Sequence, residues 1–226
     1  RWTAVSGALE RNNEQVRHIS EFQGALWIGT TKGLYAATID GQPKTGSQPA
    51  IHATVNHSFW SSPDSCWVST KEEGLLLWLP QQSKTTAYTR EKTGLPDNTI
   101  YAVYEDQQGR LWLPTNLGLG WLSTTNMDKG SFSKVSGLPA DEFNFASSYK
   151  AQDGQLFLGG VNGACSFQPG EYPFLPTSSE VKLSVAFLGR PDARGEIADA
   201  TADFVSSGEI ELSNGTSTAA HITFSM

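Results

Sequence analysis

The chain has 226 residues, of which 38% are hydrophobic and 17% are charged, so it can form one large all-β domain or two small ones and is too apolar to be disordered. Its net charge is −7, and no basic cluster is longer than two residues, which argues against nucleic acid as a partner. No apolar run approaches the roughly 18 residues of a membrane span, so contact with a membrane is expected only through a missing remainder of the protein.

Four short aromatic segments recur along the chain at nearly even spacing. They are LWIGT at 26–30, CWVST at 66–70, LWLPT at 111–115 and LFLGG at 156–160. Their aromatic residues are Trp27, Trp67, Trp112 and Phe157. Successive aromatic residues are 40, 45 and 45 positions apart, and a glycine follows each of them by six or seven positions. Even spacing of this kind is the sequence signature of a repeat protein.

The repeats lie near 9–50, 51–93, 94–136 and 137–170. The third is the clearest, because a DQQG turn and a later glycine separate runs that favour strands. Its strands are predicted near 99–105, 110–115, 118–124 and 131–136. The alternating residues of its first strand, Ile100, Ala102 and Tyr104, are matched with Phe145, Ser147 and Tyr149 of the fourth repeat. In the second repeat, the polar stretch at 84–93 is expected to hold the outer strand.

Four antiparallel strands in about 45 residues is the size of one β-propeller blade. We therefore predict an all-β fold: a partial β-propeller of about four blades, each a four-stranded antiparallel sheet. Such a repeat cannot bury its faces alone and must stack on its neighbours. In this interpretation Trp27, Trp67, Trp112 and Phe157 fill the core between blades and do not stack on a ligand.

Two segments carry a resemblance to a known family. GLPDNTIYAVYEDQQGRLWLPTNLGL at 94–119 closely resembles the two-component regulator propeller repeat, and GLPADEFNFASSYKAQDGQLFLGGVNGACSFQP at 137–169 resembles the last repeat of such a propeller. The segment from Val181 onward resembles the start of the Ig-like triple-tyrosine β-sandwich that follows these propellers. The resemblance implies propeller blades over 1–175 and a sandwich over 176–226, which is truncated because the tyrosines that name it are absent.

The resemblance also implies a function. In this family the propeller and sandwich form the periplasmic, extracytoplasmic sensor of a bacterial inner-membrane regulator, whose output is a histidine kinase or, in some bacteria, a diguanylate cyclase. Several relatives sense carbohydrates. The chain is therefore expected to be a non-catalytic sensing fragment that binds a small polar ligand or a carbohydrate. The alternative is a propeller scaffold that binds protein in surface attachment or assembly.

A ligand is expected on the side of the blades that carries the crossovers and the loops between second and third strands. Polar residues at these places form a mixed rim, which suits a polar small molecule. The candidates are Lys32, Glu72, Asp97, Asn98, Asn116, Glu142, Asn144 and Asn162. The opposing interpretation is that Asn, Asp and Gly occur there only because turns need them.

The sequence supports an enzymatic function less well than it supports ligand sensing. The D-x-x-G-x-x-W motif at 106–112 resembles the Asp-box of sialidase propellers, which is a turn and not a catalyst. A glycosidase with paired carboxylates stays open, with candidates Glu72, Glu73, Asp97, Asp141 and Glu142. The four histidines lack metal-ligand spacing, and Cys66 and Cys165 form no CxxC pair. We expect no metal and no cofactor. We also expect self-association, because four blades of a longer ring leave two open faces.

Overall fold

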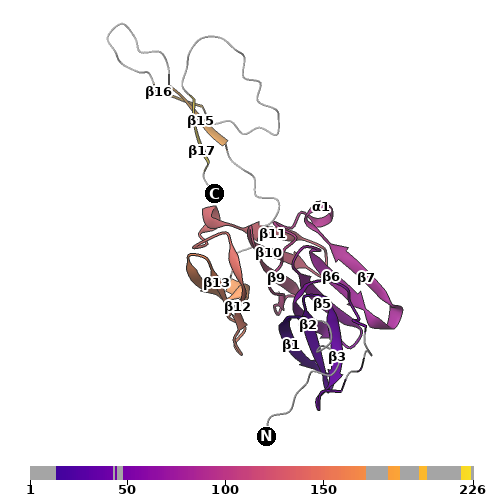
Figure 1. Ribbon diagram of the computed structural model, residues 1–226. Helices are drawn as coiled ribbons and strands as arrows, with labels where there is room; N and C mark the ends of the chain where they lie inside the picture. Colours follow the sequence, from indigo (N-terminus) through magenta and orange to yellow (C-terminus); the bar gives the residue numbers. More distant parts are fainter. Residues whose placement is uncertain are drawn as a thin grey trace. The chain divides into compact units, whose positions relative to one another are not determined.

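The computed structural model describes residues 14–42, 44 and 48–171, and the backbone of strands at 183–188, 199–202 and 220–224 (Figure 1). The chain divides into two compact units, Arg1–Tyr172 and Pro173–Met226. In the second unit, β15 (Leu183–Leu188) pairs antiparallel with β16 (Asp199–Ala202) and with β17 (Ala220–Phe224). That this unit begins a triple-tyrosine sandwich stays a prediction.

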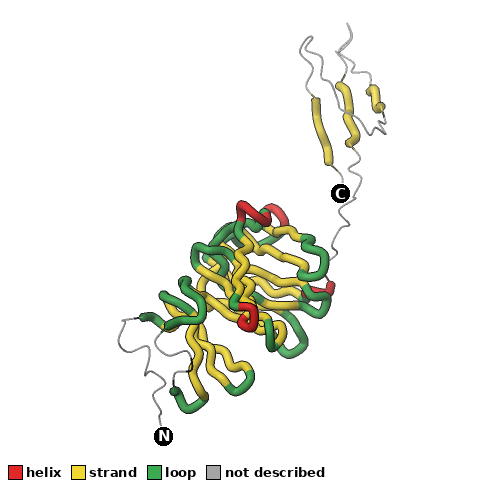
Figure 2. Tube along the Cα trace, turned by 90° about the vertical axis from the view of Figure 1, so that its right-hand side faces the viewer, coloured by secondary structure: helices red, strands yellow, loops and turns green. Residues whose placement is uncertain are grey.

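The first unit contains four antiparallel sheets, each built from strands that follow one another in the sequence. Figure 2 shows that its described part is made of strands and loops, with helix confined to short turns. The first two sheets consist of β1 (Val16–Phe22), β2 (Ala25–Thr30) and β3 (Leu34–Thr38), and of β4 (Val55–Ser62), β5 (Ser65–Thr70), β6 (Leu75–Leu79) and β7 (Lys84–Tyr88). The next two consist of β8 (Tyr104–Glu105), β9 (Arg110–Thr115), β10 (Gly118–Ser123) and β11 (Lys129–Phe132), and of β12 (Phe143–Lys150), β13 (Leu156–Gly160) and β14 (Gly163–Phe167). These sheets are the blades of a partial β-propeller, which confirms the predicted fold class.

The number of strands in a blade differs from the prediction at both ends of this unit. The second and third blades have four strands, whereas the described residues of the first and fourth form three. In the fourth blade a short 3₁₀-helix, η3 (Pro169–Glu171), follows β14. Proline cannot donate to a ladder, so an outer strand does not continue there. In the first blade the corresponding stretch includes positions outside the described residues.

Two predicted strands of the third blade are shorter than expected. The first shrinks to Tyr104–Glu105 plus an isolated bridge between Ile100 and Thr115. Its partner strand carries Pro114, which has no N–H to donate. The outer strand ends at Phe132, because Ser133 and Ser136 form a capping box on the 3₁₀-helix η2 (Lys134–Ser136). The prediction of a strand to residue 136 is therefore wrong.

The stretch at 84–93, predicted as the outer strand of the second blade, contains a strand followed by a short helix. β6 leads through the 3₁₀-helix η1 (Pro80–Gln82) into β7, which ends at Tyr88. A single turn of helix, α1 (Arg90–Thr93), follows and stops at Gly94, whose left-handed backbone (φ 68°) closes it.

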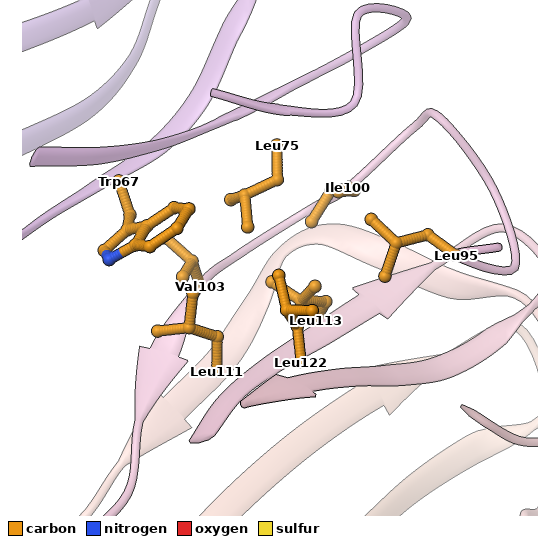
Figure 3. Close-up of a cluster of buried hydrophobic side chains, with 8 residues drawn as sticks. All are labelled: Trp67, Leu75, Leu95, Ile100, Val103, Leu111, Leu113 and Leu122. Atoms are coloured by element: carbon orange, nitrogen blue, oxygen red, sulfur yellow. The ribbon is translucent and has the colours of Figure 1, made fainter. Parts of the chain in front are cut away.

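The core lies between successive blades. Trp67 and Leu75 of the second blade pack against Ile100, Val103, Leu111 and Leu113 of the third, as Figure 3 shows. An equivalent cluster joins the first and second blades, where the ring of Trp27 lies 4.8 Å from that of Trp60. The second-strand tryptophans of the first two blades therefore pack toward the following blade, Trp67 buried and Trp27 partly buried.

Trp112 also packs against the following blade, whereas Phe157 is the exception. Trp112 is 1% exposed, and its ring centroid lies 4.8 Å from that of Phe167 in the fourth blade. Phe157 would face a fifth blade and is 42% exposed. It does not occupy the buried position that we predicted, because no described sheet covers its side of β13.

Candidate functional site

Backbone hydrogen bonds bring the crossovers and the second-to-third-strand loops to the same side of the blades, as predicted. Gly74 N donates to Asn98 O (3.0 Å), and Gly118 N donates to Asp141 O (2.7 Å). Both glycines have left-handed backbones, and a Cβ on either would clash with a neighbouring carbonyl oxygen at 2.4 and 2.3 Å. Glycine is thus required where each loop meets the next crossover.

A threonine at the end of the second strand shapes each of the first three loops. Thr30, Thr70 and Thr115 are fully buried. Thr70 Oγ1 donates to Gly74 O (2.8 Å) and accepts from Glu73 N, and the other two make the same kinds of bond within their own loops. The fourth blade has Gly160 at this place. The loops are rigid turns on which polar side chains can be held in position.

Several of the predicted ligand residues make hydrogen bonds or an ion pair within these turns. Asn98 Oδ1 accepts from Arg90 N (2.7 Å), and Asp97 Oδ1 accepts from Thr99 N (2.6 Å). Glu72 forms an exposed ion pair with Lys71. Lys32 N donates to the Thr30 hydroxyl, which places Lys32 in the loop of the first blade.

The structure gathers three other candidates around Tyr101. The Tyr101 hydroxyl donates to Asn116 Oδ1. Burial raises the pKa of Tyr101, and the nearby carboxylates of Glu142 and Asp97 raise it further, while Arg17 opposes them. Tyr101 was not among the predicted site residues, yet it contacts Asn116 of one loop, and its pKa responds to Asp97 and Glu142 of two crossovers.

The first strands of the four blades contact one another around a common centre. Ser20 of β1 bonds Ser58 of β4 (3.0 Å), the His57 ring of β4 lies 5.3 Å from the Tyr104 ring of β8, and Tyr104 bonds Ser148 of β12 (2.9 Å). Arg17 of β1 in turn packs on the ring of Phe145 of β12, which connects the first blade to the fourth. Side chains on these strands therefore meet although they are far apart in the sequence.

Four residues occupy equivalent positions at the loop end of these strands. Val16, Val55, Ile100 and Phe143 pair with the last residues of the second strands, Thr30, Thr70, Thr115 and Gly160. The residues that directly follow these four in the sequence are Arg17, Asn56, Tyr101 and Asn144. We use the term central cluster for Arg17, Asn56, Tyr101 and Asn144 together with Phe145.

Contacts inside the central cluster connect different blades. Arg17 Nε donates to Asn56 Oδ1 (2.9 Å), and buried Asn56 donates through Nδ2 to Ile100 O (2.8 Å). The Arg17 guanidinium carbon lies 3.8 Å from the centre of the Phe145 ring, a cation–π contact. Burial lowers the pKa of Arg17, and neighbouring Tyr101 partly offsets this. Asn144 is exposed and, within the described residues, makes no side-chain hydrogen bond; the same holds for Asn162.

A bulge in the fourth blade places Phe145 in this cluster. Phe143 pairs with Gly160 and Ser148 with Leu158, so four residues of β12 stand opposite Gly159 alone. Ala146 within the bulge has a left-handed backbone, with φ of 55°. The counterpart of Ile100 is therefore Phe143, and our match of Ile100 with Phe145 is wrong by two positions. Bulges and left-handed non-glycine residues concentrate at functional sites.

Two histidines lie next to the central cluster. The ring centroids of His18 and His57 are 4.1 Å apart, and His18 Nε2 and His57 Nδ1 are buried with no hydrogen-bond partner in the described part of the chain. Burial, and then the neighbouring His18, lower the pKa of His57 to about 3, and burial also lowers the pKa of His18. Across the described ranges, no set of three or more His, Cys, Asp or Glu side chains could hold a metal ion.

A second polar feature lies on the opposite side, at the hairpin turns. A cavity of about 200 Å³ opens between the turns of the third and fourth blades and is lined by Gln107, Gln108, Lys150, Gln152, Asp153 and Gln168, among others. It is smaller than the roughly 300 Å³ at which ligand pockets usually begin. No aromatic side chain lines it. The central cluster is the better candidate site.

Sequence reasoning nominated Asp97, Asn116, Glu142 and Asn144, but it missed Arg17, Asn56 and Tyr101. Their signal is weak, because an arginine, a tyrosine and two asparagines share one structural position. Aligning the repeats on the apolar residue before each of them would have revealed the set, but only once the extra residues in the fourth repeat were recognised. That insertion shifted our alignment.

Comparison with known proteins agrees with this architecture. Residues 94–113 match the family described as two component regulator propeller, so the chain carries a repeat of that family. Histidine kinase P4 of Formosa agariphila is 24% identical over 179 residues, which cover 75% of this chain and 13% of that protein. The chain therefore corresponds to a small part of this much longer relative.

Solved structures of extracellular domains share the fold. The extracellular domain of BT3049 from B. thetaiotaomicron, assigned to a hybrid two component system, is 26% identical with a TM-score of 0.63, covering 89% of this chain and 28% of that one. The extracellular domain of BT4673 from the same organism has a TM-score of 0.58 at 19% identity, covering 88% and 26% of the two chains. No helix in the part of the chain that the structure describes is both long and apolar enough to cross a membrane.

Proposed function

We propose that this chain is part of the extracytoplasmic sensor region of a bacterial two-component regulator and that it binds a small polar ligand at the central cluster. The proposal is supported by its similarity to extracellular domains of hybrid two component systems and by its two component regulator propeller repeat. The segment binds and does not catalyse, and a kinase or cyclase elsewhere in the longer protein supplies the output.

The observation that carries the binding site is the meeting of four blades at one group of polar side chains. The Arg17 guanidinium of β1 contacts the Asn56 carboxamide of β4 and the Phe145 ring of β12, and Tyr101, from the crossover before β8, donates its phenol to Asn116. Such a set can donate to and accept from hydroxyl groups and can also pack on an apolar ring face. Carbohydrates offer both kinds of surface.

A binding screen tests this proposal. The protein is titrated by calorimetry with a panel of neutral, acidic and basic mono- and disaccharides and amino acids. A compound that binds should lose at least about tenfold in affinity, about 1.4 kcal/mol, with Tyr101→Phe combined with Asn144→Ala. The matched control is Gln107→Ala combined with Asp153→Asn in the hairpin-side cavity, which should leave affinity unchanged. Loss of binding in the control alone would move the site to that cavity, and no binding from the whole panel would overturn the proposal.

A further inference from the structure

Arg17 is a partly buried cation that has no carboxylate partner among the described residues. The ion pairs of the described residues are Lys71–Glu72 and Arg110–Asp106, and neither includes Arg17. Its neighbours are instead an amide oxygen and an aromatic ring. Removing a cation from water without a compensating anion is unfavourable, so this arrangement needs another explanation.

The contacts of Arg17 orient its guanidinium and leave its outer edge unused. Nε is occupied by Asn56 Oδ1, and the guanidinium packs on Phe145. Among the described residues, neither terminal nitrogen of Arg17 makes a hydrogen bond. Those two nitrogens form a fixed fork whose geometry matches the two oxygens of a carboxylate, sulfate or phosphate group.

Of the two groups that hold the guanidinium, Asn56 is itself held firmly. Asn56 is 3% exposed and is anchored by its bond to Ile100 O. Phe145 stands in the β12 bulge, where Ala146 adopts a left-handed backbone that a residue with a side chain seldom accepts. An arginine held in this way loses little freedom when an anion binds, which favours affinity.

The charges around the cluster limit the kind of anion. Glu142 and Asp97 lie close enough to Tyr101 to raise its pKa. They would repel a second anionic group, whereas Tyr101, Asn116 and Asn144 offer donors and acceptors for hydroxyl groups. The surroundings therefore fit a ligand with one oxyanion and several hydroxyls.

We propose that Arg17 is the anchor for a single oxyanion group, a carboxylate, sulfate or phosphate, on the small polar ligand of the central cluster. The inference rests on the proposed function and narrows it from polar ligands to acidic ones. Arg17 acts as a bidentate donor, and Phe145 and Asn56 are the residues that position it.

Calorimetry with four related probes tests the inference on the whole chain. Glucuronate, glucose 6-sulfate and glucose 6-phosphate differ in their oxyanion, and glucose has none. At least one anionic probe should bind at least about tenfold tighter than glucose, and Arg17→Gln should abolish the difference. Arg17→Lys keeps the positive charge but not the paired donors of the guanidinium, so it should retain only part of the difference in affinity between the anionic probe and glucose. Lys84→Gln, which removes an exposed positive charge on β7, should change nothing.

Other results would overturn the inference in distinguishable ways. Glucose binding that is as tight as that of the anions and is unaffected by Arg17→Gln overturns the anion anchor while sustaining the proposed function. Failure of all four probes to bind overturns the anchor alone, because the wider panel tests the function. Thermal melting separates these from a folding defect: Arg17→Gln should not lower the melting temperature if Arg17 serves a ligand, whereas a fall of several degrees would assign it a structural role.

Discussion

At the scale of single residues, Trp112 and Asn116 illustrate two roles on the same strand–loop segment. Trp112 is 1% exposed, packs against Phe167 and donates from Nε1 to Asp106 Oδ2 (2.9 Å). Asn116 is only partly buried and accepts one hydrogen bond from Tyr101. The first side chain builds the interface between two blades, and the second presents an amide to the central cluster.

Replacing these residues by alanine should separate the roles. Trp112→Ala should reduce the free energy of unfolding by about 3–5 kcal/mol, the range for deleting a large buried aromatic. Asn116→Ala should cost at most about 1 kcal/mol, because a single partly exposed hydrogen bond is lost. Chemical denaturation of both variants measures the difference, and equal losses would assign Asn116 a structural role.

The histidine pair should make the stability of the blades sensitive to acid. The pKa of His57 is about 3 in the folded protein, against about 6.5 in an unfolded chain. Between these values the unfolded state binds a proton that the folded state does not, so stability is highest above pH 6.5 and falls as pH decreases toward 3. The slope is at most about 1.4 kcal/mol per pH unit for one such group. His18, whose pKa is lowered in the same direction, adds to it.

Denaturation midpoints at pH 7.5, 6 and 5 measure this dependence. His57→Phe should flatten the profile, because it keeps a ring against His18 and Tyr104 without the titrating group. His52→Phe is the matched control, since His52 is exposed, and should leave the profile as it is. A stability that rises between pH 6.5 and 5 would contradict the expected sign.

At the scale of elements, the hairpin of the third blade depends on one carboxylate. Asp106 is 4% exposed and accepts from Gln108 N, Arg110 N, Arg110 Nε and Trp112 Nε1, all at 2.8–3.0 Å. Burial alone would raise the pKa of Asp106, but hydrogen bonds from Trp112 and Arg110 outweigh it and lower the pKa. Arg110 in turn donates to Pro169 O (3.1 Å), which ties this hairpin to the end of the fourth blade.

Asp106→Ala should therefore destabilise the protein by about 3–5 kcal/mol, because it removes the buried carboxylate that accepts four hydrogen bonds and pairs with Arg110. The second blade supplies a matched control, since Asp64 is exposed in the corresponding turn, whose sequence is SSPDS. Asp64→Ala should change stability by less than about 0.5 kcal/mol. Comparable effects of the two substitutions in urea melts would show that the carboxylate network does not hold the hairpin.

The elements also show what the sequence could and could not reveal. The second and third strands were predictable because Trp, Thr and Gly recur at fixed offsets, as in 111–118, and each has one local structural task. The central cluster was not predictable, because its residues come from four repeats and no single residue type is kept at the shared position. The β12 bulge was missed because extra residues in a strand leave the alternating pattern intact on both sides.

At the scale of the whole molecule, the terminal blades of the first unit expose apolar side chains that interior blades bury. Phe157 and Tyr149 are 42% and 62% exposed on the fourth blade, and their ring centroids lie 6.5 Å apart. On the first blade, Ile19 is 59% exposed, and its neighbours His18 and Ser20 face the second blade. Trp27, Trp67 and Trp112 each contact the following blade, so the Phe157 side is the surface on which a further blade would pack.

This chain, expressed alone, should therefore self-associate through the Phe157 surface, because exposed aromatic clusters of this kind seldom stay in water on monomeric proteins. Light scattering over a dilution series should give masses above 24.5 kDa that fall as the protein is diluted. Phe157→Lys should shift the series toward the monomer, since a charge at the centre of an apolar contact opposes pairing. Val135→Lys is the matched control: Val135 is 99% exposed but lies on η2, outside the strands of the fourth blade, so the substitution should not affect the mass. A mass of 24.5 kDa at every concentration would mean that the chain covers this surface itself.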